Sequence, residues 1–167
     1  MFKAKVDTEQ LAAYFVVFHA SVFGTDALKN IAALCDFHFR DEKTFTEAFW
    51  EWFVFGLYCV GLGVNSHCDF ALRKTILDGF HAQIYSALEN AGATAHRRFA
   101  VEQTLIEYEG HGSQSSVARL AVQKIFDRPR GVLSADSMQA RELRVAIHES
   151  FKATLKEADR LFAQFTV

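Results

Sequence analysis

Apolar residues recur three and four positions apart through most of this chain, and only one proline, Pro129, interrupts it. This spacing gathers apolar side chains on one face of an α-helix, whereas a half-buried strand alternates apolar and polar residues. Alternating segments are few, and no hairpin dipeptide joins two β-branched runs. At 167 residues the chain fits one domain with a single core. We therefore predict an all-α fold, a single-domain helical bundle over residues 1–167 with about six helices.

Capping residues and glycines predict where the helices begin and end. Asp7 caps a first helix to about Phe23, and Thr25 opens a second that ends at the charged run 40–43. The fourth helix covers about 66–90, Thr94 caps a fifth to about Tyr108, and a sixth follows the loop 109–114. Ser134 caps a long C-terminal helix.

The third helix has the clearest local signal. Thr44-Phe-Thr-Glu47 matches a capping box, in which the hydroxyl and the carboxylate each satisfy a backbone N–H at the helix start. Glu47 and Glu51 are then expected on the wetter side of this helix. Gly61 and Gly63 predict its end, and Asn65 or Ser66 is expected to cap the next helix. Gly56, within it, indicates close approach of a neighbouring helix.

The stretch from Phe53 to Phe70 raises the question of a membrane span. Its oily part covers about 13 residues, whereas a spanning helix needs about 20. The N-terminus lacks the pattern of a signal peptide, because Asp7 and Glu9 precede the apolar run that starts at Leu11. We therefore expect no membrane span and a cytoplasmic location. The formal net charge of -2 argues against a surface that is generally basic.

The sequence offers little evidence for a metal site or a cofactor site. The three cysteines form no CxxC pair and are expected to be reduced core residues. Cys35 with His38, and the cluster His67-Cys68-Asp69, follow no standard zinc spacing. No nucleophile elbow, paired catalytic cysteine or dinucleotide fingerprint is present. We assign no catalytic residue, no metal ligand and no cofactor, and expect a protein without enzymatic activity.

The C-terminal helix carries a long apolar stripe that favours protein interaction. Its apolar residues repeat at spacings of three and four almost to the chain end, which is long enough either to span the bundle or to pair with another chain. The first functional hypothesis is therefore a protein-interaction module, expected to be a homo-oligomer and most simply a homodimer. Its expected interface residues are Phe151, Leu155, Phe162 and Phe165, with Trp50 and Tyr58 as exposed aromatics.

A second hypothesis is a pocket lined by aromatic residues that binds an apolar or planar small ligand. Asp78, His81 and Tyr85 lie along one strip of the fourth helix, so that a carboxylate could orient the imidazole. Gly79 in the same helix costs about 1 kcal/mol relative to alanine and indicates a close helix contact or a ligand. His19 is the other candidate to orient a ligand.

A third hypothesis reads residues 102–126 as a divergent helix-turn-helix that binds DNA. Gln114, Ser115 and Arg119 would lie near base edges, and a set of basic residues would contact phosphates: Arg97, Arg98, Lys124, Arg128 and Arg130. The turn departs from the usual pattern, with Ile106 where a small residue is expected and His111 where an apolar one is expected. Nucleic acid is therefore a possible partner that the sequence does not favour.

Overall fold

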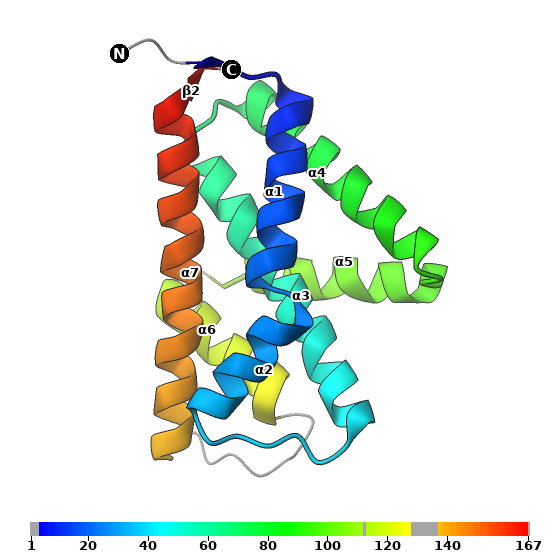
Figure 1. Ribbon diagram of the computed structural model, residues 1–167, viewed down its shortest axis with the longest axis vertical. Coiled ribbons are helices and arrows are strands. Elements are labelled where there is room, and N and C mark those ends of the chain that lie inside the picture. The colour runs from blue at the N-terminus through cyan, green and yellow to red at the C-terminus, as the bar shows by residue number, and fades with distance from the viewer. Residues whose placement is uncertain (1–3, 112, 128–136, 167) are drawn as a thin grey trace.

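The computed structural model describes residues 4–111, 113–127 and 137–166 (Figure 1). Seven α-helices lie within these ranges: α1 (Thr8–Val22), α2 (Thr25–Leu34), α3 (Glu42–Asn65), α4 (Phe70–Asn90), α5 (Ala95–Glu109), α6 (Gln114–Val122) and α7 (Met138–Gln164). A π-helical turn, η1 (Gln123–Asp127), continues α6. The predicted all-α fold with a long C-terminal helix is confirmed. Ser134, the predicted cap of that helix, lies outside the described residues.

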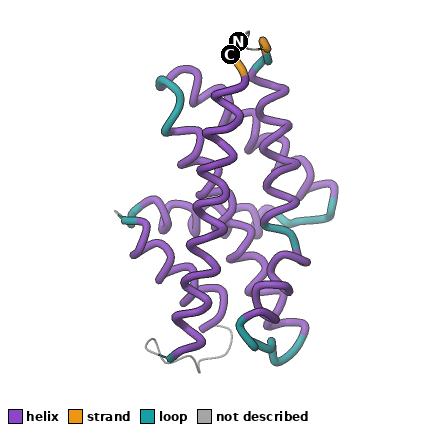
Figure 2. Tube along the Cα trace, turned by 60° about the vertical axis from the view of Figure 1, so that its left-hand side comes forward, coloured by secondary structure: helices purple, strands orange, loops and turns teal. Residues whose placement is uncertain are grey.

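The two ends of the described chain lie together. The two-residue strands β1 (Ala4–Lys5) and β2 (Phe165–Thr166) pair in parallel, with Ala4 opposite Phe165. Figure 2 shows both termini at the same end of a molecule that is otherwise almost entirely helical. This strand pair is not among the predicted elements, because two residues are too few to carry a periodic pattern.

Helix α3 is the centre of the fold. It contacts the six other α-helices and η1, and it crosses the middle of the molecule in Figure 1. Its second half is buried almost all round, including Trp52, Phe55, Leu57 and Val60, each fully covered. A helix that is apolar on every side needs neighbours on every side. The apolar run that resembled a membrane segment is therefore the core helix.

The start of α3 differs from the prediction. Asp41 is the N-cap, and its Oδ1 accepts hydrogen bonds from the backbone N–H of Thr44 at 2.8 Å and from the Thr44 hydroxyl at 2.6 Å. The Thr44 side chain is buried in the first turn, while Glu47 lies on the exposed face near Lys43. The predicted capping box is wrong, because an acidic cap three residues upstream starts the helix earlier.

Gly61 and Gly63 do not end α3, which continues to Asn65. Glycine weakens a helix interior, but packing of the surrounding turns outweighs that cost. At Gly63 a Cβ would lie 2.9 Å from the Cβ of Ala158, so glycine lets α7 approach closely. Gly56 allows the same for α1, because a Cβ there would lie 2.7 Å from Nε2 of His19 and would also collide with Phe23. The predicted close approach at Gly56 is confirmed.

Two other helix ends also differ from the sequence prediction. Helix α2 ends at Leu34, well before the charged run 40–43. Asp69, rather than Asn65 or Ser66, caps α4 by accepting the backbone N–H of Leu72 at 2.9 Å. The predicted caps Asp7 and Thr94 are confirmed.

The apolar stripe of α7 lies mainly inside the bundle. Its fully or nearly fully covered residues include Leu143, Ile147, Phe151 and Ala158. Leu155 and Phe162 are half-buried and pack against the same core. The helix contacts α2, α3 and α6, so it uses its apolar stripe to span its own domain.

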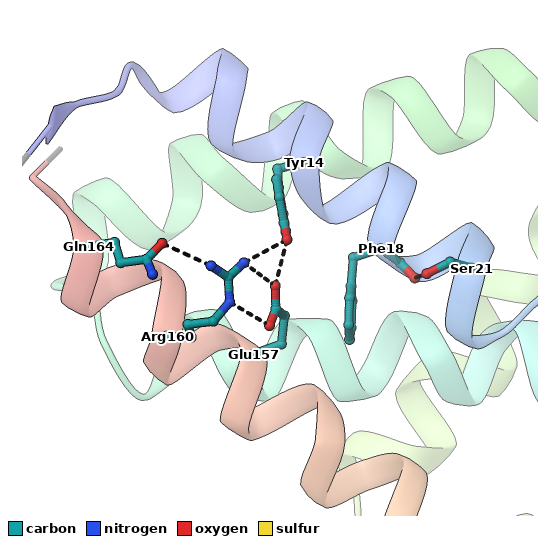
Figure 3. Close-up of polar contacts among 6 residues, drawn as sticks. All are labelled: Tyr14, Phe18, Ser21, Glu157, Arg160 and Gln164. Carbon is teal, nitrogen blue, oxygen red and sulfur yellow. Dashed lines mark hydrogen bonds and ion pairs between the residues drawn. The ribbon is translucent and has the colours of Figure 1, made fainter.

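Helix α1 is joined to α7 by a polar cluster at the surface (Figure 3). The Tyr14 hydroxyl donates to Oε1 of Glu157 at 2.6 Å and accepts from Arg160 at 2.8 Å. Arg160 also donates to Gln164 at 2.8 Å. Hydrogen bonding to the Glu157 carboxylate raises the pKa of Tyr14, chiefly because the tyrosine must stay protonated to donate.

By length and composition alone, two helical segments of the described residues could span a membrane. In the segment Thr8–Leu34, 33% of the most apolar 18-residue window is buried. In the segment Glu42–Asn65, 61% of the corresponding window is buried. The second segment is α3, and its coverage by the other helices accounts for its hydropathy. The first includes α1 and α2, which lie on the outside of the bundle.

Candidate functional site

A groove opens where the last turns of α3 meet the middle of α7 and the connection between α5 and α6. We call it the α3–α7 groove, and its volume is about 510 Å³. Tyr58 and Leu62 are four residues apart on α3, and Phe151 and Leu155 are four apart on α7, so each pair shares one helix face. These four form its apolar part. The remaining lining is polar: Asn65, Ser66, Glu109, His111, Ser113 and Gln114.

A smaller space adjoins the α3–α7 groove. This inner cavity has a volume of about 60 Å³ and lies between α3, α4 and α5. It shares Tyr58, Leu62, Asn65 and Glu109 with the groove, so the two spaces lie on either side of the same α3 turns. Its other lining residues are Leu57, Gly61, Leu77, His81 and Leu105. A space of this size holds a small ligand group or a few water molecules.

His81 lines the inner cavity and has one buried polar atom without a hydrogen bond to the described residues. Its Nε2 is buried and has no hydrogen-bond partner among the described residues. Burial lowers the pKa of this imidazole, and the nearby Asp78 and Glu102 oppose that shift only in part. The ring is therefore neutral near pH 7 and can form one further hydrogen bond at Nε2. Buried polar atoms usually have partners, so His81 is a candidate ligand-binding residue.

Gly61 leaves the wall of the inner cavity open. A Cβ added there would meet no atom within 4 Å, in contrast to Gly56 and Gly63. Packing therefore explains the other two glycines but not Gly61, which still costs helix stability relative to alanine. Its effect in this structure is to keep space beside α3. Gly61 was singled out in the sequence, but as a predicted helix end and not as a residue beside a cavity.

A second hollow lies on the other side of His111. We call it the basic hollow; its volume is about 600 Å³, and it lies between α6 and α7. Arg119 from α6 and Arg144 from α7 contribute its positive charge. Four further lining residues are polar, namely His111, Ser115, Ser116 and Gln123, and one, Leu120, is apolar. Since His111 lines both spaces, the basic hollow and the α3–α7 groove are neighbours.

A buried ion-pair cluster lies between α3, α5 and η1. Lys124 is 2% exposed, and its Nζ lies 2.6 Å from Glu107 and 3.6 Å from Glu51. The Tyr108 ring centroid is 5.9 Å from the same nitrogen. The prediction that Lys124 contacts phosphates is wrong, because its ammonium group pairs with carboxylates inside the protein. Glu51 contacts this ammonium group and keeps a side chain that is 25% exposed. The π-helical turn directs three consecutive residues, Lys124 to Phe126, into the interior.

The residues predicted for a ligand pocket do not form one site. His19 is 1% exposed among Phe23, Phe53 and Phe80. Its Nε2 lies 2.9 Å from the Phe53 carbonyl oxygen; a carbonyl only accepts, so Nε2 carries the proton.

The other predicted pocket residues on α4 have separate roles. Asp78 is exposed and pairs with Lys74, and Gly79 packs against Ala12 of α1. Tyr85 lies 6.1 Å from His81 between ring centroids and is covered by the Arg98 guanidinium. Of the predicted set, His81 alone lines the inner cavity.

The residues predicted for an interface are largely covered within the chain. Tyr58 is 8% exposed and Phe151 is 3% exposed, so the expected exposure of Tyr58 is wrong. Trp50 is half-buried, with the Arg97 guanidinium 4.8 Å from its ring centroid. Phe165 belongs to β2, and its side chain lies outside the described part of the structure. Tyr58, Phe151 and Leu155 instead line the α3–α7 groove.

The residues predicted to contact DNA lie at the two hollows. Ser115 and Arg119 line the basic hollow, and Gln114 lines the α3–α7 groove. Ser113 caps α6, and its hydroxyl accepts the backbone N–H of Ser116 at 3.3 Å. These side chains therefore border concave surfaces of a size suited to small molecules.

Metal binding has no visible basis in the described ranges. Among those residues, no group of three or more His, Cys, Asp and Glu side chains is placed to hold a metal ion. Cys35 and Cys59 are buried free thiols, and burial raises the pKa of both. His67 bonds Asp159 at 2.7 Å instead of joining Cys68 in a ligand set.

The fold and the site together define a helical bundle with an open groove and an adjoining inner cavity. Comparison with protein-family models, with curated proteins and with solved structures finds no match for this chain.

Proposed function

We propose that the protein is a non-enzymatic binder of a small molecule with an apolar or planar body. The body occupies the α3–α7 groove between Tyr58, Phe151 and Leu155, and a polar atom of the ligand reaches His81 through the inner cavity. One observation carries the proposal: a groove whose apolar part includes Tyr58 and Phe151 adjoins a cavity lined by His81, whose buried Nε2 has no hydrogen-bond partner among the described residues. The groove combines an apolar part with a polar rim, and concave spaces in which apolar lining and convergent polar groups meet are typical ligand sites.

Gly61 supports the proposal independently of His81. An alanine at this position would improve helix propensity by about 1 kcal/mol and would meet no steric obstacle. Glycine is thus less favourable for folding than the obvious alternative. Glycine instead keeps the wall of the inner cavity free of a side chain, as a ligand site there requires.

The test uses N-phenyl-1-naphthylamine, an uncharged planar probe whose fluorescence rises in apolar surroundings. We expect saturable one-to-one binding to the wild-type protein. Gly61→Leu places a side chain in the inner cavity and should weaken binding at least tenfold. Gly61→Ala should raise stability by up to about 1 kcal/mol in urea unfolding, because the methyl group meets no neighbour.

Ala87→Leu, at an exposed position of α4, is the matched control and should leave binding unchanged. Circular dichroism establishes that each variant is folded. The proposal is wrong if the wild-type protein does not bind the probe, or if folded Gly61→Leu binds it as tightly as the wild type does.

A second candidate function, homodimer formation, is favoured by the outer face of α5. Phe99 and Ile106 lie seven residues apart, on one side of that helix, and are 58% and 59% exposed. Large apolar side chains exposed close together are typical of contact surfaces. If α5 forms a dimer interface, light scattering should give twice the mass of the chain, and Ile106→Lys should restore the monomer. A monomeric wild-type protein at high concentration would rule this out.

A further inference from the structure

The α3–α7 groove and the inner cavity meet at the C-terminal ends of two helices. Asn65 is the last residue of α3 and Glu109 is the last residue of α5, and both residues line both spaces. A helix C-terminus carries a partial negative charge, because its last carbonyl groups have no partner within the helix. The N-terminus of α6 also reaches the groove, at Ser113 and Gln114, but neither residue lines the inner cavity. The junction of the two spaces therefore favours a positively charged ligand group.

Glu109 adds a full negative charge to this junction. Its side chain is exposed, and its carboxylate forms no ion pair and no hydrogen bond with the part of the chain that the structure describes. Burial raises the pKa of Tyr58, and the negative charge of Glu109 raises it further, so the carboxylate acts on the aromatic wall of the groove. Among the described residues that line the groove and the inner cavity, no lysine or arginine neutralises this charge.

The histidines at the two spaces supply hydrogen-bond acceptors. Burial lowers the pKa of His81, so the ring is neutral near pH 7, does not repel a cation and has a buried Nε2 open to a ligand. Nδ1 of His111 lies 2.9 Å from the Glu107 carbonyl oxygen. Since a carbonyl only accepts, that nitrogen carries the proton, and Nε2 of the neutral ring is an acceptor. A ligand with N–H donors therefore suits both histidines.

The sizes of the two spaces separate the charged group of a ligand from its body. The inner cavity, at about 60 Å³, accommodates a small group such as an ammonium, whereas the α3–α7 groove, at about 510 Å³, accommodates a ring system. Tyr58 lines both spaces, and an aromatic ring at such a position attracts a cation to its face.

We propose that the ligand is an amine with a planar, apolar body, protonated at neutral pH, with its cationic nitrogen beside Glu109 and its body in the α3–α7 groove. This inference rests on the proposed small-molecule function and specifies the class of ligand. The nitrogen donates to the Glu109 carboxylate and, through the inner cavity, to Nε2 of His81. The opposite orientation would move the cation towards the basic hollow, which Arg119 lines.

The test compares three competitors that share one ring system. 1-Naphthylmethylamine is a cation at neutral pH, 1-naphthalenemethanol is uncharged and 1-naphthoate is an anion. The measurement is the displacement of N-phenyl-1-naphthylamine from the wild-type protein by each compound. At low salt we expect the amine to compete at about fivefold lower concentration than the alcohol, a modest preference because Glu109 is exposed, and the carboxylate to compete least.

Glu109→Gln removes the charge at the junction and nearly preserves the size of the side chain. It should weaken binding of the amine about fivefold and affect the alcohol less, so that most of the preference disappears. Glu142→Gln is the matched control, because Glu142 is an exposed carboxylate of α7 that lines neither the groove nor the inner cavity. The control variant has the same net charge as Glu109→Gln and should keep the preference.

The outcomes separate this inference from the proposed function. If the amine and the alcohol compete equally, or if Glu109→Gln keeps the preference, the ligand is not a cation held by Glu109 and the inference is wrong. The same holds if Glu142→Gln lowers the preference as much as Glu109→Gln does, because overall charge would then account for it. Binding of N-phenyl-1-naphthylamine that is lost in Gly61→Leu would still support the proposed function. If that probe does not bind the wild-type protein, both proposals are wrong.

Discussion

Lys124 is the residue with the most costly environment among the charged residues that the structure describes. Its ammonium group is almost completely removed from water, a transfer that requires compensation by opposite charge. Glu107 and Glu51 supply that charge from two other helices, and both retain contact with solvent, with side chains 42% and 25% exposed. Lys124 therefore joins α3 and α5 to the π-helical turn.

Replacing Lys124 tests how much this junction contributes to stability. Lys124→Met keeps an unbranched side chain of similar length but removes the ammonium group that both carboxylates contact. Breaking a buried pair costs about 3–5 kcal/mol, and the partly solvated glutamates should reduce that cost. We expect Lys124→Met to lower the free energy of unfolding by about 2–3 kcal/mol in urea titrations.

The double variant Lys124→Met with Glu107→Gln supplies the control. Removing one carboxylate leaves only one that has lost its contact with the ammonium group, so the double variant should be more stable than Lys124→Met alone. If the glutamine change adds its full single-variant loss instead, the two residues are not coupled.

At the scale of the element, α3 shows what sequence patterns predict and where they fail. Its existence and apolar character follow from periodicity and are confirmed by the structure. Its boundaries depended on two local rules, a capping box at Thr44 and stops at Gly61 and Gly63, and both were wrong. The packing of α3 among its neighbours outweighs the cost of the two glycines, although of these two only Gly63 closely approaches another helix, and Asp41 supplies an earlier cap.

The cap of α3 gives a prediction at this scale. Asp41→Ala removes the acceptor for the Thr44 backbone N–H and hydroxyl, so the urea midpoint of unfolding should fall. Glu47→Gln, at the glutamate of the predicted capping box, should leave the midpoint unchanged because that side chain is exposed. Equal effects of the two changes would contradict the observed cap.

The candidate site was only partly predictable because it joins elements distant in sequence. His81 was singled out from its surroundings on α4, and Arg119 from its place on α6. The positions of His81 and Arg119 relative to each other depend on the crossing of α3 with α7 and on the position of His111. Periodicity identifies the apolar face of each helix but does not specify which faces meet. Gly61 illustrates the limit, since its role depends on empty space beside it.

At the scale of the whole molecule, one aromatic core joins α1, α3 and α4, and a titratable group lies inside it. His19 contacts Phe23, Phe53 and Phe80, and its Nε2–H donates to the Phe53 carbonyl. Desolvation lowers the pKa of His19 from 6.5 to about 4, and the hydrogen bond opposes this only in part. His81 shifts in the same direction for the same main reason.

These shifts predict that acid destabilises the whole fold before its carboxylates titrate. Between pH 6.5 and about 4 the unfolded chain binds a proton at His19 that the folded chain excludes, so the stability due to neutral His19 is complete above pH 6.5 and is lost as pH falls. At 1.36 kcal/mol per pKa unit the loss amounts to about 3 kcal/mol. Urea unfolding measured from pH 7 to pH 4.5 should show this slope.

His19→Gln keeps a hydrogen-bond donor for the Phe53 carbonyl but cannot titrate, so it should flatten most of that slope, and His81→Gln should remove a further part. Asp41 contributes little in this range, because the stability due to its carboxylate is lost only as pH falls from the ordinary pKa of 3.8 towards about 2, the pKa to which hydrogen bonds from Thr44 lower it. A folded His19→Gln variant with the wild-type pH dependence would show that the buried imidazole does not couple protonation to unfolding. The acid sensitivity would then have to arise elsewhere in the molecule.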